Sequence, residues 1–325
     1  MTRTLLLAVA CGFAVLGVAG AQTSVDDYPQ RMVTLLCPFP PGGGTDILTR
    51  ILAQGLQDKL KRPFIVENRP GAGTLVAAQA AARAAPDGYT LFIAPISTLA
   101  IAQAVHKSLP YDATKDFSPI GLAGSAQLAI IANPALGART LPELIAFIKS
   151  HDGQLSFASA GTGTPHHLFM ELFLKMIGAK AQHVPYRGSA AALTDIMSGH
   201  VPMMMVDLAV AIPAINEGKV KAYAVTSTKR VRALPDLPTI AEAGVPGYGA
   251  FAWFSLVAPA GMPRPIIDKL SGVLTAFMDR PETHERLSAL AISPLTSTPD
   301  ELARFIPAEM AKWTQVAKDA GIEPE

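Results

Sequence analysis

The chain has 325 residues, of which 50% are hydrophobic and 16% are charged, and its formal net charge is +1. About 300 residues can bury one large core or two ordinary ones, and a low charged fraction is expected when many strands and helices are buried. After the N-terminal stretch the sequence has no basic stripe, no heptad repeat and no apolar run long enough to span a membrane, which argues against nucleic-acid binding, a coiled coil and a membrane-spanning fold.

The first element is an apolar N-terminal stretch that follows Arg3 and ends in the small residues Ala19-Gly20-Ala21. This pattern is typical of a secretory signal peptide, so we expect residues 1–21 to be cleaved after Ala21. Two competing interpretations are a retained membrane anchor and a lipoprotein attached at Cys11. The run is short and rich in glycine, has no charged stop-transfer flank, and lacks the usual leucine upstream of that cysteine. Both alternatives are therefore weaker than an exported, soluble chain.

Cleavage changes both charge and cysteine content. With Arg3 removed from the 27 Lys and Arg residues, basic and acidic residues balance at 26 each. Cys11 is also lost, and Cys37 remains as the one cysteine, so the mature chain cannot form an intramolecular disulfide even in an oxidising compartment. The fold must therefore be stabilised by its core.

The first loop with a distinctive pattern is "PFPPGGGTD" at residues 38–46, between an apolar run and a helical pattern. Pro40 and Pro41 stiffen its entry, and the three glycines after them let other groups approach the backbone closely. Thr45 or Asp46 is a good N-cap for the helix, whose first amides have no partner within the helix and attract anions. A simple capped strand-to-helix connection is the alternative interpretation of the same residues.

Short apolar strands then alternate with helical patterns through the first half of the chain. We predict strands at 32–39, 63–69 and 90–95, and helices from about 45 and over 74–85. This alternation favours βαβ units and a parallel sheet, in which ligands bind at the carboxyl ends of strands. The segments "PFPPGGGTD", "NRPGAGT" and "APISTLA", the last containing Ser97, each follow a strand and should meet at one edge of the sheet.

A second strand-helix series begins after the long apolar segment 120–134, and a second long apolar segment lies at 251–261. Capping boxes at Thr140 with Glu143 and at Thr298 with Glu301 predict two helix starts, and the last helix should stop at Gly321. We therefore predict an α/β protein with two lobes, one formed by residues 22–123 plus 252–325 and the other by 124–251. Two crossing strands would join the lobes around a hinged cleft.

The second lobe contains a loop with the same character, "SAGTGTPHH" at residues 159–167. Gly161 and Gly163 keep the turn free of side chains, Thr162 and Thr164 add hydroxyls, and a helix should begin near Pro165. The segment resembles half of a phosphate loop, but the Gly-Lys-Ser/Thr ending is missing, which weakens a nucleotide-binding interpretation. A small carboxylate needs only a few amide and hydroxyl donors, which the two loops could supply from opposite lobes.

The adjacent histidines His166 and His167 do not form a good metal site. Neighbouring residues on a helix point about 100° apart, and no nearby cysteine or "HExxH" motif completes a ligand set. We therefore predict no metal, and we expect His167 to be a hydrogen-bond donor in the cleft.

Three further polar residues stand at strand-to-helix junctions. Tyr186 and Arg187 begin "YRGS", in which the arginine could clamp a carboxylate or form an ion pair on the lobe surface. Asp207 ends the strand "PMMMVD", where it could receive a ligand amine or cap the next helix. The three methionines before it are better explained as core than as a recognition surface.

A catalytic interpretation lacks a defined nucleophile and base. Ser97 and Ser159 lie in loops but outside a "GxSxG" motif, and Cys37 lies in an apolar strand without a histidine nearby in the sequence. We therefore predict that the protein is not an enzyme. An exported α/β enzyme acting on a small organic acid remains the alternative.

Several long motifs occur in one order from about Tyr28 to the C-terminus. They include "YPQRMVTLLCPFPPGGGTDILTR", "VENRPGAGT", "APDGYTL", "SAGTGTPHHLFMELF", "HVPYRGSAAALTDIMSGHVPMM", "LPDLPTIAEAGVPGY" and "WFSLVAPAGMP". Together they closely resemble the extracytoplasmic solute receptors of tripartite tricarboxylate transporters, also called Bug receptors.

The resemblance implies a type II periplasmic binding protein fold that closes on a small organic acid in the periplasm, without a cofactor. It implies partners among the membrane subunits of such a transporter or a sensor protein, no nucleic acid, and a monomer. Carried to matching positions, it implies ligand contacts on one lobe at Phe39, Gly43, Gly44, Thr45 and Asp46. On the other lobe it implies contacts at Thr162, Gly163, Thr164 and His167. Ser97, Tyr186 and Asp207 are expected at the variable end of the ligand, which could be a di- or tricarboxylate, an acidic amino acid or an aromatic acid.

Overall fold

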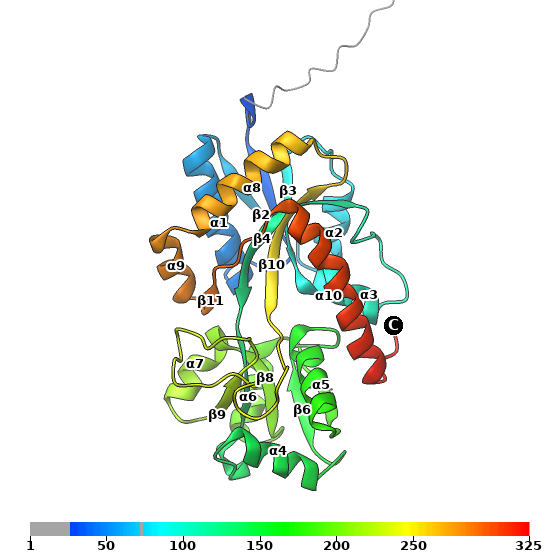
Figure 1. Cartoon of the computed structure of the whole chain (residues 1–325), viewed down its shortest axis with the longest axis vertical. Helices are drawn as coiled ribbons and strands as arrows, with labels where there is room; N and C mark the ends of the chain where they lie inside the picture. Colours follow the sequence, from blue (N-terminus) through cyan, green and yellow to red (C-terminus); the bar gives the residue numbers. More distant parts are fainter. Residues whose placement is uncertain (1–26, 72–73, 325) are drawn as a thin grey trace, which may run out of the picture.

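The computed structural model describes residues 27–71 and 74–324, so the predicted signal peptide at 1–21 lies outside the described residues. Strands of the first sheet are β1 (Val33–Cys37), β2 (Phe64–Asn68), β3 (Thr90–Pro95), β4 (Phe117–Ala126), β10 (Ala252–Pro259) and β11 (Ile292–Ser293). Their order across the sheet is β11-β4-β10-β3-β1-β2 (Figure 1). Residues from both ends of the chain therefore build this sheet.

The second sheet is built from the middle of the chain. Its strands are β5 (Leu128–Ala132), β6 (Ser156–Ser159), β7 (Gln182–Pro185), β8 (Met203–Asp207) and β9 (Lys221–Val225). Their order is β7-β6-β8-β5-β9. The predicted α/β class with two sheets is confirmed.

Both sheets are mixed, whereas the alternation in the first half of the chain predicted a parallel sheet. β1 pairs in parallel with β2 and β3, and β6 pairs in parallel with β7 and β8, as expected for βαβ units. β10 runs antiparallel to β3 and β4, and β5 runs antiparallel to β8 and β9. The antiparallel strands are those next to the crossings, because a chain that leaves one sheet and returns from the other approaches from the opposite end.

Helices cover both faces of the first sheet. On one face lie α1 (Gly44–Leu60), α8 (Arg264–Met278) and α9 (Pro281–Ser288), and their apolar sides form one core cluster with Leu35, Leu91 and Leu256. The other face is covered by α2 (Leu75–Ala82), the π-helical turn η3 (Ser97–Ile101), α3 (Ala102–Val105) and α10 (Pro299–Asp319). The strands of this sheet are accordingly almost continuously apolar.

The second sheet is likewise covered on both faces. α4 (Leu141–Ser150), after the 3₁₀ turn η4 (Pro134–Leu136), and α5 (Pro165–Ile177) pack on one face, while α6 (Ser189–Ser198) and α7 (Leu208–Asn216) pack on the other. Met203 and Met205 point to one core cluster and Met204 to the other, which confirms that the methionines belong to the core.

Two helix starts were predicted from capping boxes. At α10 the Thr298 side chain accepts from the Glu301 amide and the Glu301 carboxylate accepts from the Thr298 amide, as predicted. At α4 the Thr140 hydroxyl accepts from the Glu143 amide, but the Glu143 carboxylate accepts from the amide of Arg139, one residue before the cap. In this second capping box the carboxylate therefore bonds to the amide of the residue before the N-cap and not to the N-cap amide itself.

The chain passes between the sheets twice. It leaves β4 at Ala126 and enters β5 at Leu128, and it returns from β9 to β10 over residues 226–251. α10, which was assigned to the first lobe, packs against β4, η3 and α3 and also against α5 of the second lobe (Figure 1). The predicted lobe boundaries therefore stay a prediction. None of the helices within 27–71 and 74–324 combines the length and apolar character that a membrane crossing requires.

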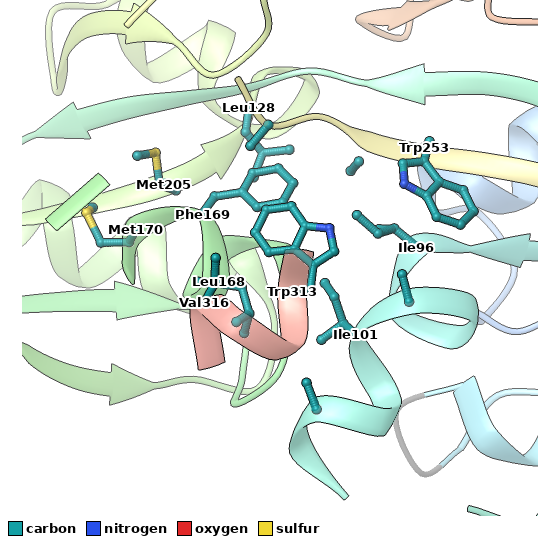
Figure 2. Packing of buried hydrophobic residues seen from close by; sticks show 14 of the residues in the cluster. Ile96, Ile101, Leu128, Leu168, Phe169, Met170, Met205, Trp253, Trp313 and Val316 are labelled. Atoms are coloured by element: carbon teal, nitrogen blue, oxygen red, sulfur yellow. The ribbon is translucent and has the colours of Figure 1, made fainter. Parts of the chain in front are cut away.

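One core cluster continues from the first sheet into the second (Figure 2). At its centre the Trp313 ring of α10 stacks on Phe169 of α5, with 5.0 Å between ring centroids. Trp253 of β10 and Trp313 both donate their indole N–H to Glu309 Oε2, each at 2.9 Å. Because Glu309 satisfies both buried donors, α10 is fixed against the first sheet while its tryptophan packs on the second lobe.

Candidate functional site

A cavity of about 360 Å³ lies between the two sheets. From the first-sheet side it is lined by residues that follow β1 and β3, among them Phe39, Thr45 and Ser97. From the second-sheet side it is lined by residues after β6, among them Thr164, and by Asp207, the last residue of β8. The carboxyl ends of parallel strands from both sheets thus face one cavity, as expected for ligand sites in α/β folds.

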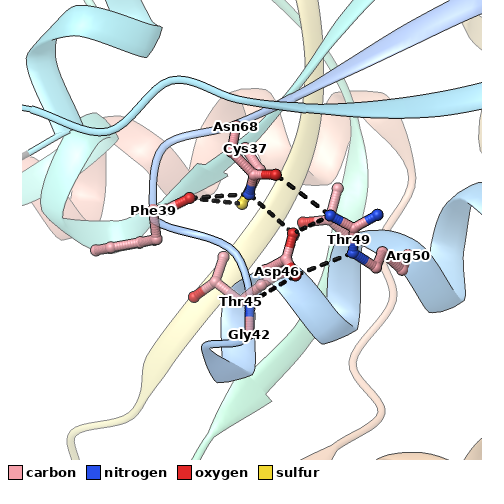
Figure 3. A network of polar contacts seen from close by, with 8 residues as sticks. All are labelled: Cys37, Phe39, Gly42, Thr45, Asp46, Thr49, Arg50 and Asn68. Carbon is pink, nitrogen blue, oxygen red and sulfur yellow. Dashed lines mark hydrogen bonds and ion pairs between the residues drawn. The ribbon is translucent and has the colours of Figure 1, made fainter.

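Phe39 and Thr45 of the glycine-rich loop 38–46 line this cavity, and Figure 3 shows both residues within the loop. α1 begins at Gly44 with Gly43 as its N-cap, which corrects the prediction that Thr45 or Asp46 caps the helix. The cap was placed too late because glycine is a weak helix former and does not mark a helix start, whereas in the structure Thr45 already falls within the first turn. Within the described residues, the amides of Gly43, Gly44 and Thr45 and the Thr45 hydroxyl have no hydrogen-bond partner. These groups are available to a ligand.

Asp46 supports this loop from behind (Figure 3). Its carboxylate accepts from the Gly42 amide at 2.9 Å, from Asn68 Nδ2 at 2.8 Å and from two nitrogens of Arg50 at 3.0 Å each. Burial acts to raise the pKa of Asp46, but the bonds from Arg50, Gly42 and Asn68 outweigh it and hold the pKa below its usual range. Asp46 is absent from the cavity wall, so its geometry is that of a positioning residue.

The second glycine loop forms the opposite wall through Thr162, Gly163 and Thr164. Thr164 is the N-cap of α5, and its hydroxyl donates to the carbonyl of Gly161 at 2.7 Å. The helix start near Pro165 is as predicted. Gly163 has a φ of +72°, and a Cβ added there would lie 2.8 Å from Cγ2 of Val105 in α3. The glycine therefore allows the second-lobe loop to approach the first-sheet helix closely.

His167 is placed away from the cavity, which corrects its predicted position. Its Nδ1 lies 3.3 Å from the Gly163 amide, which donates to it, and its ring stacks on His183 with 3.6 Å between centroids. Burial, and then the neighbouring His167, lower the pKa of His183 to about 3. Pro165 at the first helical position sets the phase of α5 so that His166, one residue earlier, lines the cavity instead.

Asp207 lies at the cavity in contact with His166 and Ser189. Its Oδ2 is 2.8 Å from His166 Nε2 and accepts from the Ser189 hydroxyl at 3.1 Å. Burial acts to raise the pKa of Asp207, and the charge and hydrogen bonds from His166 and Ser189 outweigh it, so the net shift is downward. Asp207 is also the N-cap residue of α7, although its side chain makes no capping bond there.

Tyr186 and Arg187 are not among the residues that line the cavity. The Tyr186 hydroxyl donates to Asp195 Oδ2 at 2.6 Å, and this bond, with partial burial, raises the pKa of Tyr186 to about 12. Arg187 is exposed and forms no ion pair with another described residue. The ion pair considered for this arginine is therefore not formed among the described residues.

Four residues with polar side chains at the cavity were not predicted as ligand contacts, namely Thr74, His106, His166 and Ser189. Thr74 adopts a φ of +94°, rare for a β-branched residue, and its hydroxyl shares a hydrogen bond of 2.7 Å with Thr98. Ser189 directly follows the predicted "YRG" segment, and Pro165 gives the phase of α5, so both Ser189 and His166 had a signal in the sequence. Thr74 ends the predicted loop segment "NRPGAGT", whereas no sequence pattern marked His106.

The polar groups of the cavity suit binding better than catalysis. Ser189 Oγ and Asp207 Oδ2 both approach the same nitrogen of His166, at 3.3 and 2.8 Å. A nucleophilic triad needs the acid on one imidazole nitrogen and the serine on the other. Over the described ranges, no group of three His, Cys, Asp or Glu residues could hold a metal ion.

Comparison with known proteins gives consistent matches along the chain. The family model described as tripartite tricarboxylate transporter family receptor matches residues 48–322. Protein BugT of Bordetella pertussis is 35% identical over 322 residues, which covers 99% of each chain. The periplasmic binding protein BugD is 34% identical, with a TM-score of 0.77 over 92% of this chain and 100% of that chain.

Two ligand-bound structures are also similar. The R. palustris protein Rpa4515 with adipate is 34% identical and has a TM-score of 0.82, covering 92% of this chain and all of that one. MatC from Rhodopseudomonas palustris with bound malate is 33% identical and has a TM-score of 0.75, covering 89% and 99% of the two chains.

Proposed function

This chain belongs to the tripartite tricarboxylate transporter receptor family, whose members are periplasmic solute-binding proteins, and we propose that it captures a small carboxylate in the cavity between its two sheets. One observation carries the proposal: Thr45, whose amide and hydroxyl are unpartnered among the described residues, lines the same cavity as the loop 162–164, and the unpartnered amides of Gly43 and Gly44 directly precede it. Helix N-termini and bare amides are favourable surroundings for an anion.

The proposed carboxylate contacts come from both walls. The amides of Gly43 and Gly44 and the amide and hydroxyl of Thr45 donate from the first lobe. Thr162, Gly163 and Thr164 contribute from the second lobe, and Phe39 and Ser97 contact the remainder of the ligand. Asp46, His167 and Tyr186 are proposed to support these groups without touching the ligand, because each side chain is engaged elsewhere. Asp46 bonds to groups behind the loop, His167 stacks on His183, and Tyr186 donates to Asp195.

The energetic requirement is moderate. Micromolar binding requires about 8 kcal/mol, and each hydrogen bond to a charged group contributes about 1.5 to 3 kcal/mol. Several such bonds supply this free energy after the cost of ordering the ligand and closing the lobes. A formally neutral mature chain is compatible with this, because local dipoles rather than a net positive field attract the acid.

Family membership also suggests where the protein acts and what it delivers its ligand to. We propose that residues 1–21 direct export to the periplasm and are removed after Ala21. The mature chain then acts as a monomer that delivers its ligand to membrane subunits of a tripartite transporter or to a sensor protein. Relatives bind adipate and malate, which supports a small organic acid as the ligand class. Catalysis is not part of the proposal, because the serine and the carboxylate share one imidazole nitrogen.

A thermal-shift screen of purified residues 22–325 against organic acids tests the proposed function. Hits are measured by titration calorimetry, and acids that copurify are identified by mass analysis. We expect at least one acid to stabilise the protein in a concentration-dependent way without being converted. Failure of every acid to bind, or turnover of the bound acid, would contradict the proposal.

A further inference from the structure

Thr74 lies on the cavity wall in a backbone conformation that disfavours its side chain. It directly precedes α2 with φ of +94° and ψ of −10°, a left-handed conformation that glycine adopts freely and a β-branched residue rarely. Such strain persists only where surrounding contacts hold it, and it is concentrated at ligand sites. The Thr74 side chain is therefore expected to make contacts that offset the strain.

The side chain of Thr74 is held by a bond between two hydroxyls. Thr74 Oγ1 and Thr98 Oγ1 are 2.7 Å apart, and among the described residues neither hydroxyl has another hydrogen-bond partner. Thr98 lies in the π-helical turn η3, and its carbonyl accepts from the Tyr111 hydroxyl at 2.7 Å. Turns of this kind are rare and often occur at functional sites. The hydroxyl pair therefore joins the loop after β2 to an unusual turn after β3.

The surroundings of the two hydroxyls decide which of them donates. Each hydroxyl has one hydrogen, so one threonine donates to the other, and the second keeps a hydrogen for a further acceptor. Thr98 is 1% exposed and does not line the cavity, so a hydrogen kept by Thr98 would be buried without an acceptor among the described residues, which is costly. Thr74 lines the cavity, so its hydrogen can be given to a bound molecule. Thr98 is therefore the donor of the pair.

The same wall offers a second hydroxyl. Ser97, one residue before Thr98, also lines the cavity, and its hydroxyl has no partner within the described ranges. Lysine and arginine are absent from the described residues that line the cavity, so neutral donors must bind the oxygens of an acid there. Thr74 and Ser97 supply two such donors from the loops after β2 and β3.

We propose that Thr74 contacts the bound acid, its hydroxyl donating to an oxygen of that acid while accepting from Thr98. This proposal rests on the proposed function and adds to it a donor from the loop after β2. The acid therefore carries an acceptor oxygen, from a carboxylate, hydroxyl or carbonyl group, that reaches the wall formed by Thr74 and Ser97. Thr98 is a positioning residue, because it directs the Thr74 hydrogen without touching the acid.

The test is titration calorimetry with adipate, malate, citrate, glutamate and benzoate, of which the acid that binds the wild type most tightly is used for the variants. Thr74→Val replaces the hydroxyl by a methyl group of the same shape, and we expect it to weaken binding about tenfold or more. Thr74→Ser retains the hydroxyl and should bind within about threefold of the wild type. Thr98→Val removes the other hydroxyl of the pair but leaves the Thr74 hydrogen for the acid, so it should also stay within about threefold.

Thr74→Gly suits the positive φ and also lacks the hydroxyl, so it takes the place of Thr74→Val if that variant does not fold. Equal weakening by the Thr74 and Thr98 variants would mean that the pair only stabilises the wall, and unchanged affinity without the Thr74 hydroxyl would exclude the contact. Either result overturns this inference and leaves the proposed function intact. Absence of binding of all five acids to the wild type overturns both.

Discussion

Thr45 is the residue whose proposed ligand contact is easiest to isolate. Its hydroxyl lines the cavity and has no partner within the described residues, whereas the Thr164 hydroxyl also holds the carbonyl of Gly161. Thr45→Val keeps the shape and removes the donor, so we expect ligand binding to weaken by about 1.5 to 3 kcal/mol with little change in stability. Titration calorimetry measures this, and Thr45→Ser, which retains the hydroxyl, is the control. Equal affinities in all three proteins would exclude a contact by this hydroxyl.

Asp46 should affect stability rather than ligand contact. Asp46→Asn removes charge-assisted bonds to Arg50, Gly42 and Asn68. We expect the free energy of unfolding to fall by about 2 kcal/mol, and not by more, because solvent screens the half-exposed Arg50. Asp58→Asn, at an exposed site on the same helix, is the control for chemical denaturation.

The Asp46 effect should also depend on pH. Because the folded-state pKa of Asp46 lies below its ordinary value, its stabilisation is complete above the unfolded pKa of about 3.9 and is lost as the pH falls through the folded value. The difference in stability between the wild type and Asp46→Asn should therefore shrink below about pH 4. A difference that stays constant from pH 7 to pH 3 contradicts the assigned charge state.

At the residue scale, the sequence located the loops better than the individual side chains. Gly43, Thr45 and Thr162 were predicted because glycine-rich loops with hydroxyl residues follow strands there and because the family resemblance placed ligand contacts at these positions. The choice of His167 over His166 was wrong in position because it depends on the phase of α5, which Pro165 sets at the first helical residue. Thr74 reaches the cavity through an unusual backbone angle that no local pattern encodes.

At the element scale, the close approach of loop 159–167 to α3 is the contact that a substitution can block. Gly163→Ala adds a Cβ 2.8 Å from Val105 Cγ2 and also strains a backbone with φ of +72°. We expect it to weaken ligand binding at least tenfold by holding the two walls apart. The measurement is titration calorimetry with an acid from the screen.

Val105→Ala separates the two effects of this substitution. Combined with Gly163→Ala it removes the clash but leaves the backbone strain, so most of the lost affinity should return. Val105→Ala alone serves as the control. If the double variant binds as weakly as Gly163→Ala, backbone strain in the loop rather than the close approach explains the loss.

The elements themselves were largely predictable, because apolar runs, glycine turns and the Thr298 cap each carry a local physical signal. The start of α1 was predicted two or three residues too late, since glycine is a weak helix former and Gly44 enters the helix only because the loop is held by Asp46. The π-helical turn at Ser97 and the antiparallel pairing of β10 depend on contacts distant in sequence, so no local pattern predicted them.

At the scale of the whole molecule, α10 connects the two lobes through contacts with both. Trp313 stacks on Phe169 of the second lobe while Glu309 accepts from Trp253 of the first sheet, and Lys175 of α5 pairs with Asp319 at the end of α10. Both tryptophans of the chain lie in this contact. Their fluorescence therefore reports on the junction between the lobes.

We expect one cooperative unfolding transition for residues 22–325, with tryptophan fluorescence and far-ultraviolet circular dichroism coinciding. Trp313→Ala should cost about 3 to 5 kcal/mol, since it empties a fully buried site between the lobes. Ala303→Gly, at a solvent-exposed position of the same helix, controls for helix propensity and should cost about 1 kcal/mol. Two separated transitions in the wild type would show that the lobes unfold independently.

The two-sheet plan and both crossings followed from where the strand-helix alternation stops and restarts. The bridging role of α10 did not, because an amphipathic C-terminal helix does not reveal which of two lobes its apolar side will cover. Only the folded arrangement places its tryptophan between them (Figure 2).

The most direct measurement of the central claim is a crystal structure of residues 22–325 with an acid from the screen. The account predicts the carboxylate of that acid within hydrogen-bond distance of the Gly43 to Thr45 amides on one side and of loop 162–164 on the other. A carboxylate bound outside the space between the two sheets, or one inside it that touches neither glycine loop, would contradict the account.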